Sequence, residues 1–201
     1  MAGSFSRASA KAPSALFALL LAAAAAHADV WVLSVEPSFT ESKIRRPIEG
    51  SQRTVVAVAR LVDGEIEPLT REQKKSVHMT FAQVREKALG TAEAVLARLE
   101  PKFVRDKNKV ITHAVLESGD PLVASSVLAP GFAEKFRSTL GPDLLVAMPN
   151  RNTVLVFSRQ DDAHLRMAEA VVGAYLESDY RVSREVFALE GGRLRSLGVL
   201  R

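Results

Sequence analysis

The chain has 201 residues, with 27 lysines and arginines, 23 aspartates and glutamates, and no cysteine. A length of this order fits one domain, or at most two small ones. The ordinary share of apolar and charged residues excludes a mainly disordered chain, a collagen and a coiled coil. Without cysteine the chain has no disulfide framework, no thiol nucleophile and no zinc–thiolate or iron–sulfur site.

Residues 1–28 have the pattern of a secretory signal peptide. Arg7 and Lys11 give a positive start, residues 14–26 form an apolar run, and the run closes on an Ala-His-Ala cleavage site. The run is shorter than the roughly 18 residues that a membrane span needs. We expect cleavage after Ala28 and an exported protein, periplasmic or secreted, with no stable membrane insertion after cleavage. An uncleaved N-terminal anchor helix is the alternative.

Removal of this leader lowers the net charge of the chain and so changes what the charge indicates about binding partners. The leader carries two basic residues and no acid, so the formal net charge falls from +4 to +2. The basic character therefore gives no support for nucleic-acid binding. The basic run at residues 102–109 contains Phe103 but is interrupted by Asp106, and aromatic residues make up only 6% of the chain. We expect a solvated loop there and no nucleic-acid partner.

The strands of the mature chain are predicted from runs of β-branched and aromatic residues bounded by turn residues. The expected strands lie, in chain order, at residues 30–35, 53–62, 110–116, 144–148, 153–157, 185–189 and 193–197. Residues 36–52 are polar, carry proline and glycine, and are expected to form a loop. Hairpin turns are expected at Asp-Gly 63–64, at the four-residue loop 149–152 and at Gly-Gly 191–192.

Two longer helices are predicted from apolar residues at helical spacing. The first, residues 80–100, begins with a Thr-x-x-Gln capping box, and the second, residues 161–177, begins with paired aspartates. A shorter helix is expected between residues 130 and 141. The apolar run at residues 122–128 resembles a strand.

Strands grouped in pairs and separated by helices predict the α+β class. We expect a mainly antiparallel sheet with the two longer helices packed on one face. In this division of the chain, residues 29–52 are an N-terminal strand and loop, and residues 53–201 are a single α+β domain.

Acidic and histidine side chains gather at the start of the second long helix, where Asp161, Asp162 and His164 are close in sequence. Such a group can hold a divalent cation, but aspartates are also common helix caps and are favoured by the positive end of the helix. We interpret them as caps and expect no metal. No glycine-rich phosphate-binding motif occurs, so no cofactor is expected either.

A serine and a histidine of the chain form a candidate catalytic pair, which is the alternative to a non-catalytic protein. Ser125 or Ser126 follows an apolar run, and His113 on a neighbouring strand is available as its base, which would make a cofactor-free serine hydrolase. The Gly-x-Ser-x-Gly pattern of a nucleophile elbow is absent. The other interpretation is that the two serines are small residues packed beneath a helix.

The loop at residues 149–152 places an arginine between two asparagines: Asn150, Arg151 and Asn152. A guanidinium group presents five donors in a planar fork and can hold a carboxylate or phosphate in a bidentate way. Ordinary turn chemistry explains the same residues without a ligand. We take the three as candidate binding residues and expect the Arg151 side chain to be free on a rigid hairpin tip.

The order of four stretches is similar to that of a known family: residues 55–63, residues 80–99, residues 124–128 with 141–151, and residues 180–187. Together they resemble the YtpQ-like family, a bacterial domain of unknown function, over about residues 53–197. The resemblance implies a single α+β domain. It adds Ser183 and Phe187 to Arg151 as candidate binding residues and implies no activity.

The sequence as a whole therefore favours an exported, non-catalytic α+β protein that binds a partner or a ligand. The partner is an unknown protein or a small anionic ligand. The serine hydrolase with His113 as its base is the alternative function.

Overall fold

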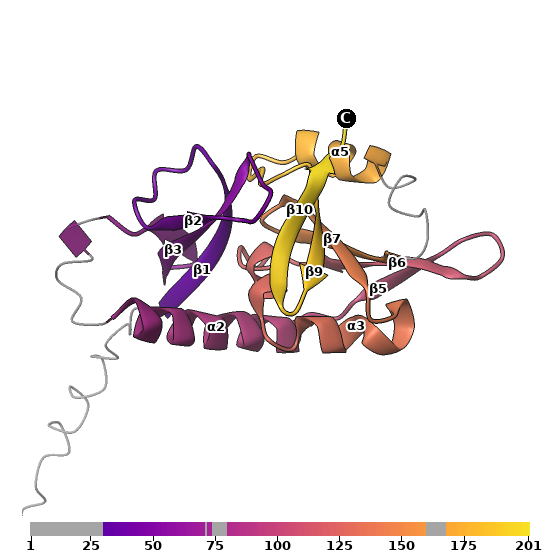
Figure 1. Ribbon diagram of the computed structural model, residues 1–201, viewed down its shortest axis with the longest axis horizontal. Helices are drawn as coiled ribbons and strands as arrows, with labels where there is room; N and C mark the ends of the chain where they lie inside the picture. The colour runs from indigo at the N-terminus through magenta and orange to yellow at the C-terminus, as the bar shows by residue number, and fades with distance from the viewer. Residues whose placement is uncertain (1–29, 71, 74–79, 160–167) are drawn as a thin grey trace, which may run out of the picture.

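The computed structural model describes residues 30–70, 72–73, 80–159 and 168–201 (Figure 1). The elements are, in chain order, β1 (Val30–Pro37), β2 (Arg45–Pro47), β3 (Thr54–Val62), β4 (Glu65–Pro68), α2 (Phe81–Arg98), β5 (Lys102–Arg105), β6 (Ile111–Glu117), η1 (Ala124–Leu128), α3 (Phe132–Leu140), β7 (Leu144–Asn150), β8 (Thr153–Ser158), α5 (Ala168–Leu176), β9 (Glu185–Glu190) and β10 (Arg193–Val199). The predicted signal peptide lies outside the described residues.

The described strands form two sheets, and every ladder within them is antiparallel. In the first, sheet A, β3 is central: it pairs with β1 along one side and with β2 and then β4 along the other. The β3–β4 connection is the predicted hairpin turn, since Asp63 and Gly64 both have positive φ angles, 49° and 85°.

The second sheet, sheet B, has the strand order β10-β9-β7-β8-β6-β5. The β7–β8 hairpin is tighter than the predicted four-residue loop, because Asn150 pairs with Thr153 and leaves Arg151 and Asn152 as the turn. The β9–β10 hairpin turns at the predicted Gly-Gly pair, where both glycines have positive φ. The sequence predicts one sheet, whereas the strands divide into two.

Helices lie on both faces of sheet B and not on one. The predicted capping box of α2 is present, with Thr80 and Gln83 bonded reciprocally, and α2 packs against β1 and η1. Figure 1 shows α2 and α3 along one side of the molecule and α5 along the opposite side, against β7. The α+β class is confirmed. The prediction that the two longer helices share one face is not confirmed, and the first residues of the second helix lie outside the described chain.

The apolar clusters explain this two-sided arrangement. Val146 of β7 shares a cluster with Phe132 of α3, while the next residue, Ala147, shares another with Val171 of α5. Alternate residues of a strand point to opposite faces. A strand covered by helices on both faces is therefore apolar throughout, and all of β7 is buried. A third cluster, around Trp31, lies between sheet A and α2.

Three elements differ from the sequence prediction. β2 lies inside the expected loop at residues 36–52, and β5 lies inside the basic run at residues 102–109. Both are edge strands whose residues are all exposed, so their sequences carry charge in place of apolar alternation. The apolar run at residues 122–128 forms the short buried helix η1 and no strand.

A glycine allows the chain after β2 to come close to the edge of sheet B. Gly50 has a φ of +72°, and a Cβ added to it would lie 3.0 Å from the carbonyl oxygen of Ser196. We expect Gly50→Ala to lower the free energy of unfolding by roughly 1–3 kcal/mol, because it adds backbone strain and a clash. Urea denaturation measures this change.

The matched control is Gly90→Ala. Gly90 lies inside α2, and a Cβ there meets nothing within 4 Å. This variant should therefore gain up to about 1 kcal/mol from helix propensity. A Gly50→Ala protein as stable as the parent chain would contradict the close approach of the two segments.

Candidate functional site

Arg151 lies on the β7–β8 turn, but its side chain is not free. Its Nη2 lies 3.0 Å from both carboxylate oxygens of Glu36, at the end of β1 in the other sheet. The guanidinium also lies over the ring of Tyr180, 5.9 Å from its centroid. The Glu36 side chain is only 7% exposed and accepts a further hydrogen bond from Ser34. The expectation of a free donor fork is wrong, because a buried carboxylate 115 residues earlier in the chain holds it.

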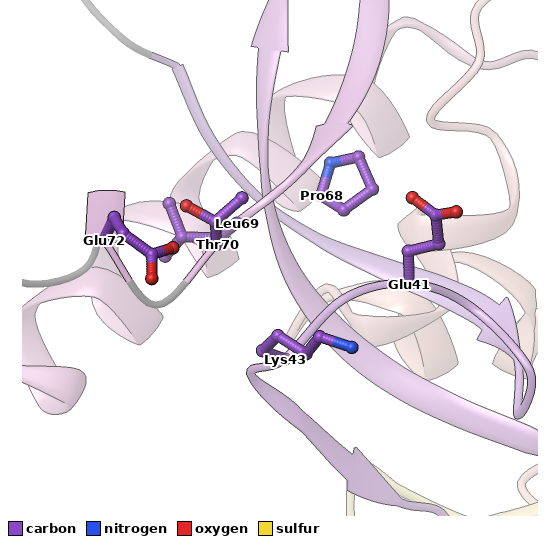
Figure 2. A pocket seen from close by; sticks show the side chains of 6 residues that line it. All are labelled: Glu41, Lys43, Pro68, Leu69, Thr70 and Glu72. Carbon is purple, nitrogen blue, oxygen red and sulfur yellow. The ribbon is translucent and has the colours of Figure 1, made fainter.

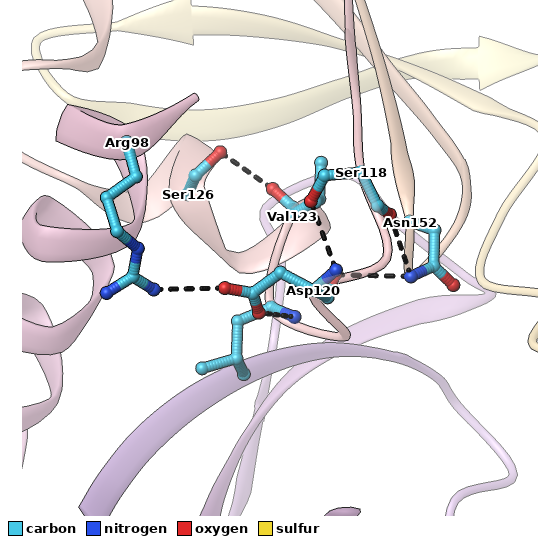
Figure 3. Close-up of polar contacts among 7 residues, drawn as sticks. Arg98, Ser118, Asp120, Val123, Ser126 and Asn152 are labelled. Atoms are coloured by element: carbon cyan, nitrogen blue, oxygen red, sulfur yellow. Dashed lines mark hydrogen bonds and ion pairs between the residues drawn. The ribbon is translucent and has the colours of Figure 1, made fainter. Parts of the chain in front are cut away.

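The two asparagines beside Arg151 form hydrogen bonds with the backbone of neighbouring segments. Asn150 accepts a hydrogen bond from the backbone N–H of Asn152 and donates to the carbonyl oxygen of Ala174 in α5. Asn152 donates to the carbonyl oxygens of Ser118 and Asp120, at 3.1 and 3.2 Å (Figure 3). Both side-chain amides are therefore already hydrogen-bonded to backbone groups of the protein.

The remaining two predicted residues are buried. Phe187 is fully enclosed in the largest apolar cluster, on the face of sheet B that carries α3. Ser183 is 3% exposed, and its Oγ lies 2.7 Å from the hydroxyl oxygen of Thr54 in sheet A. Phe187 acts as a core residue, while Ser183 joins the two sheets.

Beside Ser183, the carboxylate of Glu185 is buried between the sheets at 2% exposure. It accepts hydrogen bonds from the hydroxyls of Ser51 at 2.7 Å and Thr54 at 2.6 Å, and from Ser196 and the backbone N–H of Gln52 at longer distance. Within the described residues no cation pairs with it, so hydroxyl and amide donors alone offset the loss of its hydration.

These contacts make up what we call the polar junction between the sheets: Ser34, Glu36, Ser51, Thr54, Arg151, Ser183 and Glu185. Sequence reasoning found Arg151 and Ser183 but missed both acids. A signal for them exists, since Glu36 directly follows the apolar residues of one strand and Glu185 directly precedes those of another. An acid in such a place is buried with the strand and needs donors nearby.

The residues of the hydrolase alternative do not come together. Ser126 is fully buried, and its hydroxyl donates to the carbonyl oxygen of Val123 at 2.6 Å (Figure 3). His113 alternates along β6 with Ala114, which faces the cluster containing Val127 of η1. The imidazole therefore lies on the other face of the strand from the serines. Burial lowers the pKa of His113.

Acidic and histidine side chains form no metal-sized group within the described part of the chain. The candidate cluster of Asp161, Asp162 and His164 lies outside the described residues. Its interpretation as helix caps therefore stays a prediction.

A groove of about 560 Å³ opens between sheet A, α2, η1 and the β9–β10 hairpin. Its apolar floor is made of Leu33, Ile44, Ile48, Val56, Val58, Leu89, Leu128 and Leu194. These side chains come from segments spread between β1 and β10, so no local sequence motif marks the site. We call this cavity the basic groove, for the charges at its rim.

Cationic side chains surround the floor of the basic groove: Lys43, Arg45, Arg46, Arg85 and Arg193, all of them exposed. Glu49 is the one acid among the described lining residues. Arg45 already donates to two backbone carbonyl oxygens. Lys43, Arg85 and Arg193 make no side-chain hydrogen bond or ion pair with any described residue. The groove thus combines an apolar surface with three cations, Lys43, Arg85 and Arg193, that have no counter-ion in the described chain.

A pocket of about 660 Å³ with charges of both signs adjoins this groove at Lys43. Figure 2 shows Glu41 and Lys43 on the chain before β2, Pro68 at the end of β4 and Thr70 just after it, with Glu72 beyond them. Two carboxylates and one ammonium group give this pocket no single sign of charge. It therefore defines no ligand class.

Comparison of the chain with protein-family models, with curated proteins and with solved structures finds no match. The resemblance to the YtpQ-like family therefore stays a prediction. Across the residues that the structure describes, no helix has both the length and the apolar character to cross a membrane.

Removal of the Arg151 side chain leaves the Glu36 carboxylate buried without its cation. We expect Arg151→Ala to lower the free energy of unfolding by about 2–4 kcal/mol. The double variant Glu36→Gln/Arg151→Met should recover part of this loss, because it removes the unpaired charge and keeps an acceptor for Ser34. Urea denaturation of the three proteins measures both changes.

A surface ion pair provides the control. Arg137 and Glu134 of α3 are paired at 2.8 Å with more than half of each side chain exposed. Arg137→Ala should therefore change stability by less than about 0.5 kcal/mol. An equally small effect of Arg151→Ala would contradict the structural role of the buried pair.

Proposed function

We propose that the mature chain is an exported, non-catalytic binding module whose ligand occupies the basic groove. The ligand class is an anionic amphiphile, a molecule with an apolar body and a carboxylate or similar group at one end. One observation carries the proposal: an apolar floor and an excess of cationic side chains meet in the same cavity.

The floor supplies the binding energy for the apolar body of the ligand. Cavities of about 300–1,000 Å³ lined by apolar side chains are the usual size for small-molecule sites, and the groove has about 560 Å³. Leu89 and Leu128 are only partly buried by the protein itself, so they keep apolar surface that a ligand can cover. Each 100 Å² of such surface removed from water contributes about 2.5 kcal/mol.

The rim supplies the preference for an anion. The mature chain as a whole is close to neutral, whereas five cations and one acid line this groove, so the positive charge is local. Lys43, Arg85 and Arg193 have no partner among the described residues. A carboxylate at the mouth gains charge-assisted hydrogen bonds without breaking an existing ion pair there.

The absence of catalysis is part of the same proposal. It is supported by the occupied hydroxyl of Ser126 and by the placement of His113 on the opposite face of its strand. No specific observation favours the hydrolase. Within the part of the chain that the structure describes, we find no surface that favours the other expected partner, an unknown protein, over a small anionic ligand.

Export is proposed on the sequence of residues 1–28. The described fold begins with β1 at Val30, directly after the proposed cleavage site, so cleavage after Ala28 removes none of the described elements. Resemblance to the YtpQ-like family is compatible with a binding role and supplies no ligand.

Decanoate is a suitable probe for the groove. We expect it to bind to the mature protein in isothermal titration calorimetry, more tightly than 1-decanol, which lacks the charge, and butyrate, which lacks the apolar body. Arg85→Ala/Arg193→Ala should weaken decanoate binding by about tenfold or more, as the loss of charge-assisted contacts implies. Leu128→Gln should weaken binding of decanoate and decanol alike, because it removes apolar floor.

Lys107→Ala is the control, since Lys107 is an exposed cation on the β5–β6 hairpin and does not line the groove. It should leave decanoate binding unchanged. Equal affinity for decanoate and butyrate, or full binding by the double arginine variant, would contradict the proposed site.

Processing is tested by the mass of the exported protein. Cleavage after Ala28 predicts a mature N-terminus at Asp29, and intact-mass measurement on protein from the cell-envelope or secreted fraction checks it. Recovery of the full chain with Met1 on membranes would favour the uncleaved anchor helix.

A further inference from the structure

A third cavity, of about 280 Å³, lies where the two sheets meet and contains positive charge that no described residue pairs with. Its lining consists of Pro37, Ser38, Phe39, Arg53, Tyr175, Val182, Ser183, Arg184 and Val199. The described linings of this cavity and of the basic groove have no residue in common. We call it the arginine pocket.

The charged side chains of the described lining are Arg53 and Arg184, with no acid beside them. Neither guanidinium donates a hydrogen bond or forms an ion pair within the described residues. Other arginines nearby are different: Arg151 is held by Glu36, and Arg181 donates to the carbonyl oxygen of Leu176. The pocket therefore contains two donor groups for which the described chain supplies no acceptor.

An aromatic ring fixes the position of one of these arginines. The guanidinium of Arg184 lies over the ring of Tyr175, 5.5 Å from its centroid, and Arg181 lies 5.8 Å from the same centroid. A cation–π contact attracts the guanidinium through its charge and uses none of its hydrogen-bond donors. Because no described acceptor takes the N–H groups of Arg184, they stay available for a bidentate contact with an oxyanion. Holding the donor in place before binding lowers the ordering cost of the complex.

The buried acid that directly follows Arg184 in sequence does not pair with the two arginines. Glu185 follows the pocket residue Ser183 closely in sequence, but its carboxylate is 2% exposed and already accepts bonds from Ser51 and Thr54. Its negative charge is therefore enclosed by the polar junction and does not form an ion pair with Arg53 or Arg184.

The mouth of the arginine pocket is apolar. Phe39 is 83% exposed and Val199 is 38% exposed, and both line the cavity. An exposed phenyl ring beside two arginines suits a ligand in which an aromatic or small apolar group adjoins the anion. Its volume is about half that of the basic groove, 280 against 560 Å³, which favours a shorter apolar group here.

We propose that the arginine pocket is a second binding site, for a compact oxyanion that carries an aromatic or small apolar group. The shared chemistry is a planar or tetrahedral group of charged oxygens, from a carboxylate or from a phosphate monoester. Arg53 and Arg184 bind the oxygens, and Phe39 packs against the apolar group.

Benzoate, phenyl phosphate and inorganic phosphate are the probes, each titrated into the mature protein by calorimetry. We expect benzoate or phenyl phosphate to bind, and the tighter of the two identifies the source of the anion. Arg53→Ala and Arg184→Ala should each weaken that binding about tenfold, and Arg184→Lys should recover little, because an ammonium group cannot replace a bidentate fork. Phe39→Ser should lower the affinity of the protein for phenyl phosphate to its affinity for inorganic phosphate.

Lys107→Ala serves again as the control of equal charge, and thermal melting checks that each variant is folded. The binding of decanoate should be unchanged in Arg53→Ala/Arg184→Ala, which separates this site from the basic groove. Failure of benzoate and phenyl phosphate to bind at millimolar concentration, or equal binding by the folded arginine variants, would overturn the proposal.

Discussion

Two carboxylates that are buried between the sheets determine how sheet A docks on sheet B. Glu36 belongs to sheet A and is paired with Arg151 of sheet B. Glu185 belongs to sheet B and accepts bonds from Thr54 of sheet A and from Ser51, just before that strand. A buried charge without donors is costly. Each acid therefore has its full set of donors only when the other sheet is in place, and this requirement specifies one relative position of the two. The basic groove and the arginine pocket depend on that position, because residues of both sheets line each of them.

Local signals predict much of the fold. The Asp-Gly turn, the capping box of α2 and the two hairpins of sheet B appear in the structure close to where the sequence places them, because each is specified by neighbouring residues. β2 and β5 were missed because edge strands carry exposed charge. The division into two sheets and the placement of α5 opposite α3 depend on contacts between distant segments, which periodicity does not report.

The candidate sites depend even more than the fold on contacts between distant segments, which the sequence does not report. The composition of the β7–β8 loop identifies Arg151 correctly as an unusual residue, but the acid that holds it is on β1 and no local pattern connects them. The floor of the basic groove is assembled from β1, the residues on either side of β2, β3, α2, η1 and β10. Arg53 and Arg184 are likewise far apart in sequence, and each alone looks like an ordinary surface arginine. Such sites form only when the sheets pack together, so they follow from the tertiary fold and not from the local sequence.

The central claim is that the polar junction makes the two sheets one cooperative unit. Native-state hydrogen exchange, followed residue by residue at increasing denaturant, tests it most directly. The account predicts that the backbone amides of β3 in sheet A and of β7 and β9 in sheet B exchange through a common opening, with the same free energy and the same dependence on denaturant. Exchange of the β1 and β3 amides at a clearly lower free energy, while β7 and β9 stay protected, would show that sheet A opens on its own and would contradict the claim.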